Sequence, residues 1–219
     1  MRRAPKLVLF DLDGTLIDSQ AGILGSLQHA FGRIGAQLPP ADVLRSWIGP
    51  PFHVTFPQVL GDDAERIDAA IAHYREHYSS IGWAQHEVYA GVDAVIADLR
   101  ALGSTLAVVT TKFHVYAERI VARLPYGPEF ARVYGVDAGI KHSAKAEMIA
   151  TALRDFGVAA NDAAMVGDRH FDVDGARANA VRSVGVLWGF GSAEELRGAG
   201  ADAVVASPAE LGEILLARG

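Results

Sequence analysis

The sequence contains no cysteine among its 219 residues. This absence excludes disulfide bonds, thiolate metal sites and a cysteine nucleophile. Long apolar runs are also missing, since the stretch behind the basic start reaches only from Leu7 to Phe10. A signal peptide needs a longer run with a cleavage site, and a spanning helix needs about 18 apolar residues. We therefore expect a cytoplasmic protein that has no membrane partner.

Positive charge is scarcer than negative charge, which leaves a formal net charge of -6. This balance argues against a protein that binds nucleic acid or an anionic surface. Half of the residues are hydrophobic and 21% are charged, as is ordinary for a globular protein. The length allows one large domain, or a medium domain that carries a smaller insertion.

Short apolar runs without alternation recur along the chain, as is typical of strands buried on both faces of a parallel sheet. Helix-length segments separate them, with a cap at Ser143 and capping boxes at Ser192 to Glu195 and Ser207 to Glu210. Strands that alternate with helices predict an α/β domain with a parallel sheet. The predicted strands are Lys6–Phe10, Thr105–Val109, Ala163–Val166, Ser183–Leu187 and Ala203–Val205, with Val133–Val136 as a weaker candidate.

One stretch, from about Asp18 to Gln85, contains no strand candidate. Its apolar residues follow helical spacing, in two stripes that we expect to be core packing. Asp62 and Glu65 mark the start of one of its helices. We predict an α/β core of residues 1–17 and 86–219 and a helical domain of residues 18–85. The stripes are Ile23, Leu27, Phe31 and Ile34, and then Ile67, Ile71 and Tyr74.

Two carboxylates and a turn follow the first predicted strand. Asp11 and Asp13 lie two positions apart, so in extended chain their side chains point the same way. Gly14 and Thr15 then give a tight turn whose backbone amides are candidates for holding phosphate oxygens. A calcium loop would need glycine at its sixth position and glutamate at its twelfth, where this sequence has leucine and glycine. The calcium interpretation therefore fails.

Two further predicted strands also end in polar residues. Thr110, Thr111 and Lys112 follow one of them, and Asp168 follows the other, with Asp172 one helical turn later. The carboxyl ends of parallel strands meet at one edge of the sheet, which is where ligands bind. Carboxylates gathered there need a cation between them. Oxygen ligands favour Mg²⁺ when a phosphate completes its shell.

These motifs, in this order, resemble phosphatases of the haloacid dehalogenase superfamily, in the branch of phosphoglycolate phosphatases and 5'-nucleotidase-like enzymes. The resemblance implies a Rossmann-like core with a small all-helical cap domain inserted after the first strand. One departure is Ala180, where the family usually has glycine. The matching motifs are Asp11-Leu12-Asp13-Gly14-Thr15, then Thr110, then Lys145 (with Lys141 as an alternative), and finally Met165-Val166-Gly167-Asp168 through Asp172 to Asn179.

By this resemblance, Asp11 is the nucleophile that forms an aspartyl-phosphate. Mg²⁺ is held by Asp11, by the backbone carbonyl of Asp13 and by Asp168. Asp13 protonates the leaving alcohol and then takes a proton from the attacking water. Dehalogenases of the superfamily lack a carboxylate at that position, so Asp13 favours phosphate-ester chemistry.

The same resemblance assigns the remaining site residues. Lys145 and Thr110 hold phosphoryl oxygens, with Thr111 beside them and the turn amides of Gly14 and Thr15 opposite. Asp172 orients a metal-bound water or Lys145. Lys112 is interpreted as a neighbour of the second motif and not as the catalytic lysine.

Other readings of the same motifs remain. A phosphonatase needs a cap lysine, and no lysine occurs between Leu7 and Thr111, which excludes that reaction. A β-phosphoglucomutase-like enzyme and a non-catalytic binder with the same fold stay as alternatives. In the cap, His53 and Arg75 are candidates for contacts with the leaving group. The expected substrate is a small phosphorylated metabolite such as phosphoglycolate, a nucleoside monophosphate or a sugar phosphate. The protein is expected to be a monomer or a homodimer.

Overall fold

The computed structural model describes residues 4–50, 52–137 and 145–216 and divides into two compact units. Residues 1–17 and 88–219 form the core unit, and residues 18–87 form the helical unit. The chain passes from one to the other at β2 (Ile17–Asp18) and β3 (Glu87–Val88), which pair with each other. The helical unit ends at Glu87, whereas we predicted its end at Gln85.

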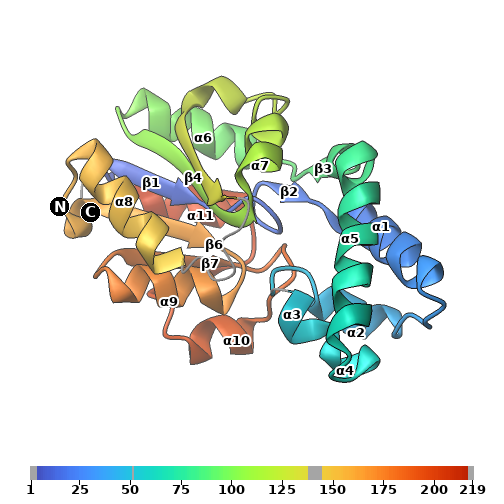
Figure 1. The fold of residues 1–219 in the computed structure, drawn as a ribbon. Helices are drawn as coiled ribbons and strands as arrows, with labels where there is room; N and C mark the ends of the chain where they lie inside the picture. Colours follow the sequence, from blue (N-terminus) through green and yellow to red (C-terminus); the bar gives the residue numbers. More distant parts are fainter. Residues whose placement is uncertain (1–3, 51, 138–144, 217–219) are drawn as a thin grey trace. The chain divides into compact units, whose positions relative to one another are not determined.

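The core unit is built on a six-stranded parallel sheet (Figure 1). The order is β5-β4-β1-β6-β7-β8. When only the six strands of this sheet are numbered along the chain, the order is 3-2-1-4-5-6, as in doubly wound Rossmann folds. The predicted Rossmann-like α/β fold is confirmed. The strands are β1 (Leu7–Phe10), β4 (Thr105–Phe113), β5 (Phe130–Val136), β6 (Ala163–Gly167), β7 (Arg182–Val186) and β8 (Ala203–Val205).

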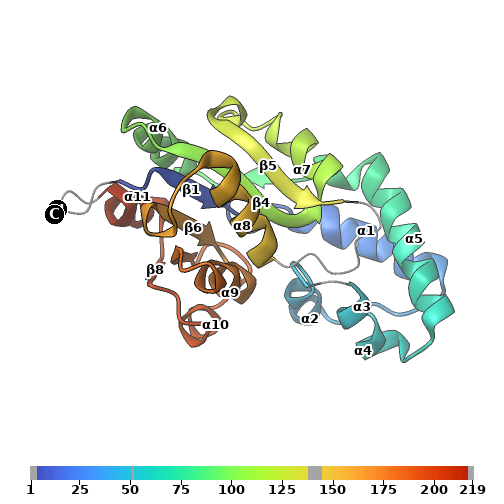
Figure 2. The same cartoon turned by 60° about the vertical axis from the view of Figure 1, so that its left-hand side comes forward.

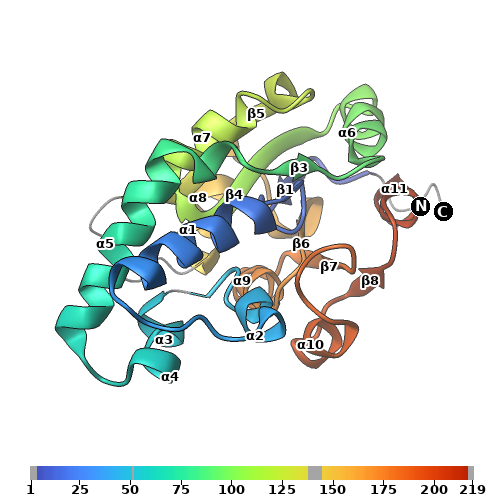
Figure 3. The same cartoon turned by 90° about the vertical axis from the view of Figure 1, so that its right-hand side faces the viewer.

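Helices cover both faces of this sheet. On one face, Ile149 of α8 and Ala176 of α9 join a buried cluster with Leu9, Val109 and Met165 of the sheet, and Figure 2 shows these two helices in front of the strands. On the other face, α6 and α11 contact each other (Figure 3). The helices are α6 (Val92–Ala101), α7 (His114–Val121), α8 (Lys145–Phe156), α9 (His170–Ala178), α10 (Ala193–Gly198) and α11 (Pro208–Leu216), with the 3-10 turns η2 (Gly127–Glu129) and η3 (Ala160–Asp162).

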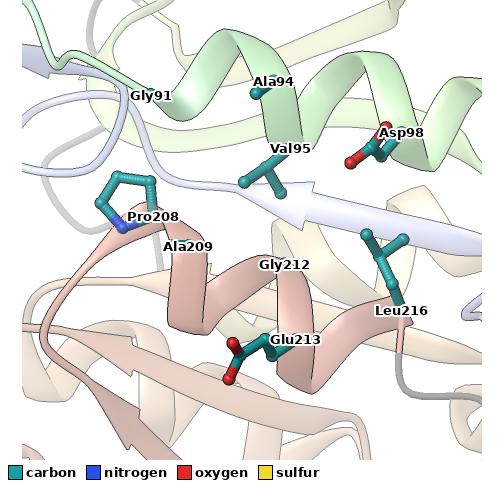
Figure 4. A pocket seen from close by; sticks show the side chains of 9 residues that line it. All are labelled: Gly91, Ala94, Val95, Asp98, Pro208, Ala209, Gly212, Glu213 and Leu216. Atoms are coloured by element: carbon teal, nitrogen blue, oxygen red, sulfur yellow. The ribbon is translucent and has the colours of Figure 1, made fainter.

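A groove with a volume of about 620 Å³ runs between α6 and α11 (Figure 4). Ala94 and Asp98 line it from α6, and Gly212 and Glu213 line it from α11. None of the predicted site residues lines this groove.

Strand β4 is longer than predicted, because it continues from Val109 to Phe113. Its pairing with β5 shifts register between these two residues, which lie opposite Tyr134 and Val136. Thr110, Thr111 and Lys112 therefore lie within the strand, not after it.

Capping differs from the predicted pattern at α10. Ser192 Oγ accepts a hydrogen bond from the backbone N–H of Glu195, as a capping box requires. The Glu195 carboxylate, however, accepts from the Arg169 side chain and from the backbone N–H of His170, because the start of α9 lies beside it. The predicted cap at Ser143 lies outside the described residues.

The helical unit has an aromatic core. Phe31, Trp47 and Phe56 pack against one another with ring centroids 5.4 to 5.9 Å apart. The two predicted apolar stripes are buried, although Ile34 is only half-buried. Asp63, not Asp62, caps α5 by accepting from the backbone N–H of Arg66. Its elements are α1 (Gln20–Arg33), α2 (Ala41–Ser46), α3 (Phe52–Thr55), α4 (Pro57–Leu60), α5 (Ala64–Ser80) and η1 (Gly82–Ala84).

None of the described helices combines the length and the apolar character that crossing a bilayer requires.

Candidate active site

The site lies at the carboxyl ends of β1 and β6, where the strand order of the core sheet reverses. These strands pair in parallel, with Phe10 opposite Val166. The backbone N–H of Asp11 continues the ladder by donating to the Val166 carbonyl over 2.9 Å. Asp11 and Asp168 are thus fixed next to each other at the switch point, the usual ligand position in open α/β sheets.

Lys145, the first residue of α8, is buried against two carboxylates. Its Nζ lies 2.9 Å from Asp11 Oδ2 and donates a short hydrogen bond to Asp172 Oδ1. The other oxygen of Asp172 accepts from the backbone N–H of Arg169 over 3.0 Å, in the first turn of α9. Asp172 therefore holds Lys145 toward Asp11.

Asn179 ties the two helices of this arrangement together. Its Nδ2 donates to the carbonyl of Ala146 in α8 and to that of Gly175 in α9, each over 2.9 Å. Ala180 follows with a φ of 53°, the only positive φ among the described residues that are not glycine. The family's usual glycine at this place has a physical reason, because a left-handed backbone is costly for a residue with a Cβ.

Burial dominates the electrostatics of the carboxylates. It raises the pKa of Asp11 to about 7, although Lys145 partly offsets the effect. Burial also raises the pKa of Asp168 well above its usual value, and the nearby charges of Asp172 and Asp11 add to the rise. Burial alone would lower the pKa of Lys145, but the attraction of Asp11 and Asp172 outweighs it and raises the pKa. The site holds more negative charge than its lysine neutralises.

Lys112 is closer to the chemistry than we predicted. Its Nζ lies 2.9 Å from Asp13 Oδ2, and both side chains are mostly buried. The other oxygen of Asp13, Oδ1, is buried without a hydrogen-bond partner among the described residues. We predicted Lys112 to be only a neighbour of the second motif, because its distance along the chain from Asp13 does not reveal this contact.

The backbone amides of the turn after Asp13 have partners within the turn. The backbone N–H of Gly14 donates to the Ile17 carbonyl over 2.8 Å, and that of Thr15 donates to the Leu12 carbonyl over 3.3 Å. A role for Gly14 and Thr15 in binding phosphate stays a prediction. Thr15 Oγ1 is buried with no partner in the described part of the chain.

Gly14 has a different role, which its backbone and surroundings define. It has a φ of 77°, and a Cβ at this position would overlap the carboxylate of Asp168. Glycine is therefore required for the turn and for the close approach of Asp168 to it.

The two threonines of β4 differ in exposure. Thr110 is buried, and its Oγ1 accepts from the backbone N–H of Lys112 over 3.2 Å. Thr111 is exposed, as the alternation of side chains along a strand requires. A role for Thr110 and Thr111 in binding phosphate stays a prediction.

The loop after β7 belongs to the site and was missed in the sequence. The backbone N–H of Phe190 donates to Asp168 Oδ2 over 2.7 Å, and Trp188 Nε1 donates to the Thr15 carbonyl over 3.1 Å. Gly189 lies between them, against Asp168 and the carbonyl of Gly14. The available signal was position, since this loop follows the carboxyl end of the strand next to β6.

Three predicted residues remain, namely His53, Arg75 and Lys141. His53 in α3 and Arg75 in α5 are exposed residues of the helical unit. Lys141, the alternative to Lys145, lies outside the described residues.

The donor set fits a hard divalent cation. Carboxylate oxygens of Asp11, Asp168 and Asp172 lie within 4.8 Å of one another, and Asp168 Oδ1 is buried with no partner among the described residues. With Asp13, these residues make four carboxylates against the two ammonium groups of the lysines. Oxygen ligands and an excess of negative charge match Mg²⁺ better than a softer metal.

Fold and site together define a Rossmann-like α/β protein with a buried carboxylate–lysine centre at its switch point. The chain belongs to the haloacid dehalogenase-like hydrolase family, whose model matches residues 8–186.

Relatives within the family carry different names. The chain is 38% identical over 190 residues to a 5'-nucleotidase of Pseudomonas aeruginosa, covering 87% of this chain and 86% of that protein. It is 40% identical over 192 residues to the tyrosine-protein kinase PtkA of Mycobacterium tuberculosis, covering 87% of this chain but only 65% of that protein. The crystal structure of a predicted phosphatase from Clostridium acetobutylicum superimposes with a TM-score of 0.89 at 35% identity, covering 97% and 99% of the two chains.

Proposed function

We propose that this protein is a Mg²⁺-dependent phosphatase that hydrolyses a small phosphorylated metabolite through an aspartyl-phosphate on Asp11. One observation carries the proposal: Asp11 ends β1 beside Asp168, with the ammonium of Lys145 2.9 Å from its carboxylate. A nucleophile, a cationic group for phosphoryl oxygens and a cation site are thus adjacent. The resemblance to the 5'-nucleotidase supports the same chemistry.

Asp11, Asp13 and Asp168 would hold the Mg²⁺, with Asp13 contributing its backbone carbonyl. The ion would supply charge neutralisation between the carboxylate nucleophile and the phosphate dianion. Asp168 is the strongest ligand candidate, since burial and like charges disfavour its ionised form unless a cation is present.

In the first step, an Asp11 oxygen attacks phosphorus, the new O–P bond forms and the bond from phosphorus to the leaving alcohol breaks. Asp13 gives its proton to the leaving oxygen. Asp13 Oδ1 is the atom proposed for this transfer, because Oδ2 already contacts Lys112. Lys145 binds a phosphoryl oxygen and stabilises the charge that develops on it.

In the second step, a water attacks phosphorus and the bond to Asp11 breaks, which restores the carboxylate and releases inorganic phosphate. Asp13 takes the proton of that water and returns to its starting form. Asp172 contributes by positioning Lys145 through both steps.

We also propose that the helical unit acts as the cap domain that selects the substrate, with residues 1–17 and 86–219 as the catalytic core. His53 and Arg75 are its candidates for contacts with the leaving group. Replacing either by alanine should raise KM for the natural substrate and leave hydrolysis of p-nitrophenyl phosphate nearly unchanged. Equal KM values for variant and wild type would remove that residue from the proposal.

The proposal is tested by hydrolysis of p-nitrophenyl phosphate with Mg²⁺ and with EDTA. We expect activity only with Mg²⁺, and a loss of at least about 10⁴-fold for Asp11→Asn. Asp174→Asn is the matched control, because this neighbouring carboxylate is 56% exposed and pairs only with His170 among the ion pairs of the described residues. Activity that survives EDTA or Asp11→Asn would contradict the mechanism.

A panel of phosphorylated metabolites separates the substrate classes and the alternatives. Release of phosphate from phosphoglycolate, nucleoside monophosphates or sugar phosphates identifies the substrate. Interconversion of sugar phosphates without release would indicate the mutase. Transfer of the γ-phosphate of ATP to tyrosine would indicate the activity named for PtkA, and no turnover of any kind would indicate a binder.

A further inference from the structure

A cluster of imidazole and carboxylate groups bridges two helices of the helical unit, and it is independent of the proposed phosphatase site. Helices α1 and α5 lie side by side (Figures 1 and 3). His29 projects from α1, and His73 and Glu76 project from α5. One ligand atom from each of the three lies within 4.8 Å of the others.

The distances converge on one carboxylate oxygen. Glu76 Oε2 lies 3.2 Å from His73 Nδ1 and 3.9 Å from His29 Nε2. His29 Nε2 is buried and has no hydrogen-bond partner among the described residues. A buried polar atom without a protein partner requires an explanation, and binding of an ion would supply one.

The ring of His29 is held in place by its neighbours. The ring of His77 lies 5.0 Å away at 30°, and His77 Nδ1 contacts Ser26 Oγ over 3.0 Å. Fixed rings of this kind are what a metal site needs from the groups behind its ligands.

An ion can reach this cluster and would meet negative charge there. The Glu76 side chain is 63% exposed, whereas His29 and His73 are about half as exposed or less. The Glu76 carboxylate supplies that charge, with its Oε2 within 3.9 Å of both His73 Nδ1 and His29 Nε2.

We infer that His29, His73 and Glu76 form a binding site for a divalent transition-metal ion of the Zn²⁺ class. Two imidazole nitrogens and one carboxylate are a common three-residue ligand set for Zn²⁺, with water in the fourth position. The same set is poor for Mg²⁺, which requires oxygen ligands. The ion would connect α1 to α5 and thereby stabilise the helical unit.

Calorimetric titration of the tag-free, EDTA-treated protein with Zn²⁺ tests this site. The titration is done in excess Mg²⁺, which occupies oxygen-only sites and keeps the carboxylates of the core unit from competing. We expect one Zn²⁺ to bind per chain, a higher melting temperature, and visible absorption bands of tetrahedral Co²⁺ when Co²⁺ replaces Zn²⁺. No binding by the wild type would overturn the inference.

Variants assign the binding to these residues. Glu76→Gln should weaken binding at least about tenfold without disturbing packing, because its side chain is largely exposed. His29→Gln should do the same, and circular dichroism will show that it is folded. His114→Gln is the control, since this histidine of the core unit also pairs with a glutamate, over 3.2 Å. Equal affinity for wild type and Glu76→Gln would refute the site, and the result does not depend on phosphatase activity.

Discussion

The metal-free protein should lose stability as the pH rises, because its site buries carboxylates. Burial raises the pKa of Asp11 from 3.8 to about 7. Between these values the folded protein keeps a proton that the unfolded chain has released, so the free energy of unfolding falls as the pH increases. A pKa raised by about three units changes the free energy of unfolding by about 4 kcal/mol over this pH range, at ~1.4 kcal/mol for each unit. Asp168 acts in the same direction, since its pKa is also raised.

The assay is urea unfolding in EDTA from about pH 4 to pH 8, for the wild type and for Asp11→Asn. An amide does not titrate here, so the difference between the two proteins isolates Asp11. Across this pH range, the free energy of unfolding of Asp11→Asn should rise by roughly 4 kcal/mol relative to that of the wild type. The two units are analysed as separate transitions where they unfold separately. Asp174→Asn keeps Asp11, so its stability should follow that of the wild type across this pH range.

Mg²⁺ should reverse the trend for the wild type, because a cation favours the ionised carboxylates. The reasoning fails if the wild type in EDTA instead gains stability over Asp11→Asn as the pH rises. That outcome would mean that the attraction of Lys145 outweighs burial and that the carboxylate needs no further cation.

Three more changes are expected to have measurable effects. Lys145→Met should lower kcat by about 10²- to 10³-fold, as the loss of a group that stabilises developing charge does, and a wild-type kcat would remove it from the mechanism. Lys112→Met should lower kcat about tenfold with little change in KM, because Asp13 loses a charged partner 2.9 Å away; a change in KM alone would contradict this. Ala180→Gly should raise the melting temperature by a few degrees, since it removes roughly 1 kcal/mol of left-handed strain. Ala178→Gly, at the last residue of α9, where φ is not positive, should not raise the melting temperature, and the same rise for both glycines would refute the strain argument.

The buried parallel strands were predictable from sequence because both of their faces are covered. β1 and β6 have continuous apolar runs that are fully buried, and their predicted bounds agree with the structure to within a residue. The end of β4 was not predictable, because polar residues at Thr110 to Lys112 read as a loop. In the structure the strand runs through them to Phe113, which pairs with Val136 of β5, a tertiary contact that the sequence pattern does not reveal.

The residues that carry the chemistry of the site could be predicted from the sequence, but their contact partners could not. Asp11, Asp168 and Lys145 stood out because strand ends and a helix start place them. The contact of Lys112 with Asp13 and that of Phe190 with Asp168 join segments far apart in the chain, which spacing does not reveal. The engagement of the Gly14 and Thr15 amides within their own turn was likewise invisible, since the same residues also suit an open, anion-binding turn.

The pairing of β2 with β3 has a consequence for how such proteins diversify. It brings Ile17–Asp18 and Glu87–Val88 together, so the helical unit leaves and re-enters the core through neighbouring backbone segments. The two ends of the insertion between β1 and β4 are therefore as close together as the ends of a short loop. Lengthening such a loop adds little to the entropic cost of closing it. A block with such closely spaced ends can be exchanged for another of different size while Asp11, fixed by β6, keeps its position. With the proposed role of the helical unit in selecting the substrate, grafting it between relatives should transfer selectivity without rebuilding the chemistry.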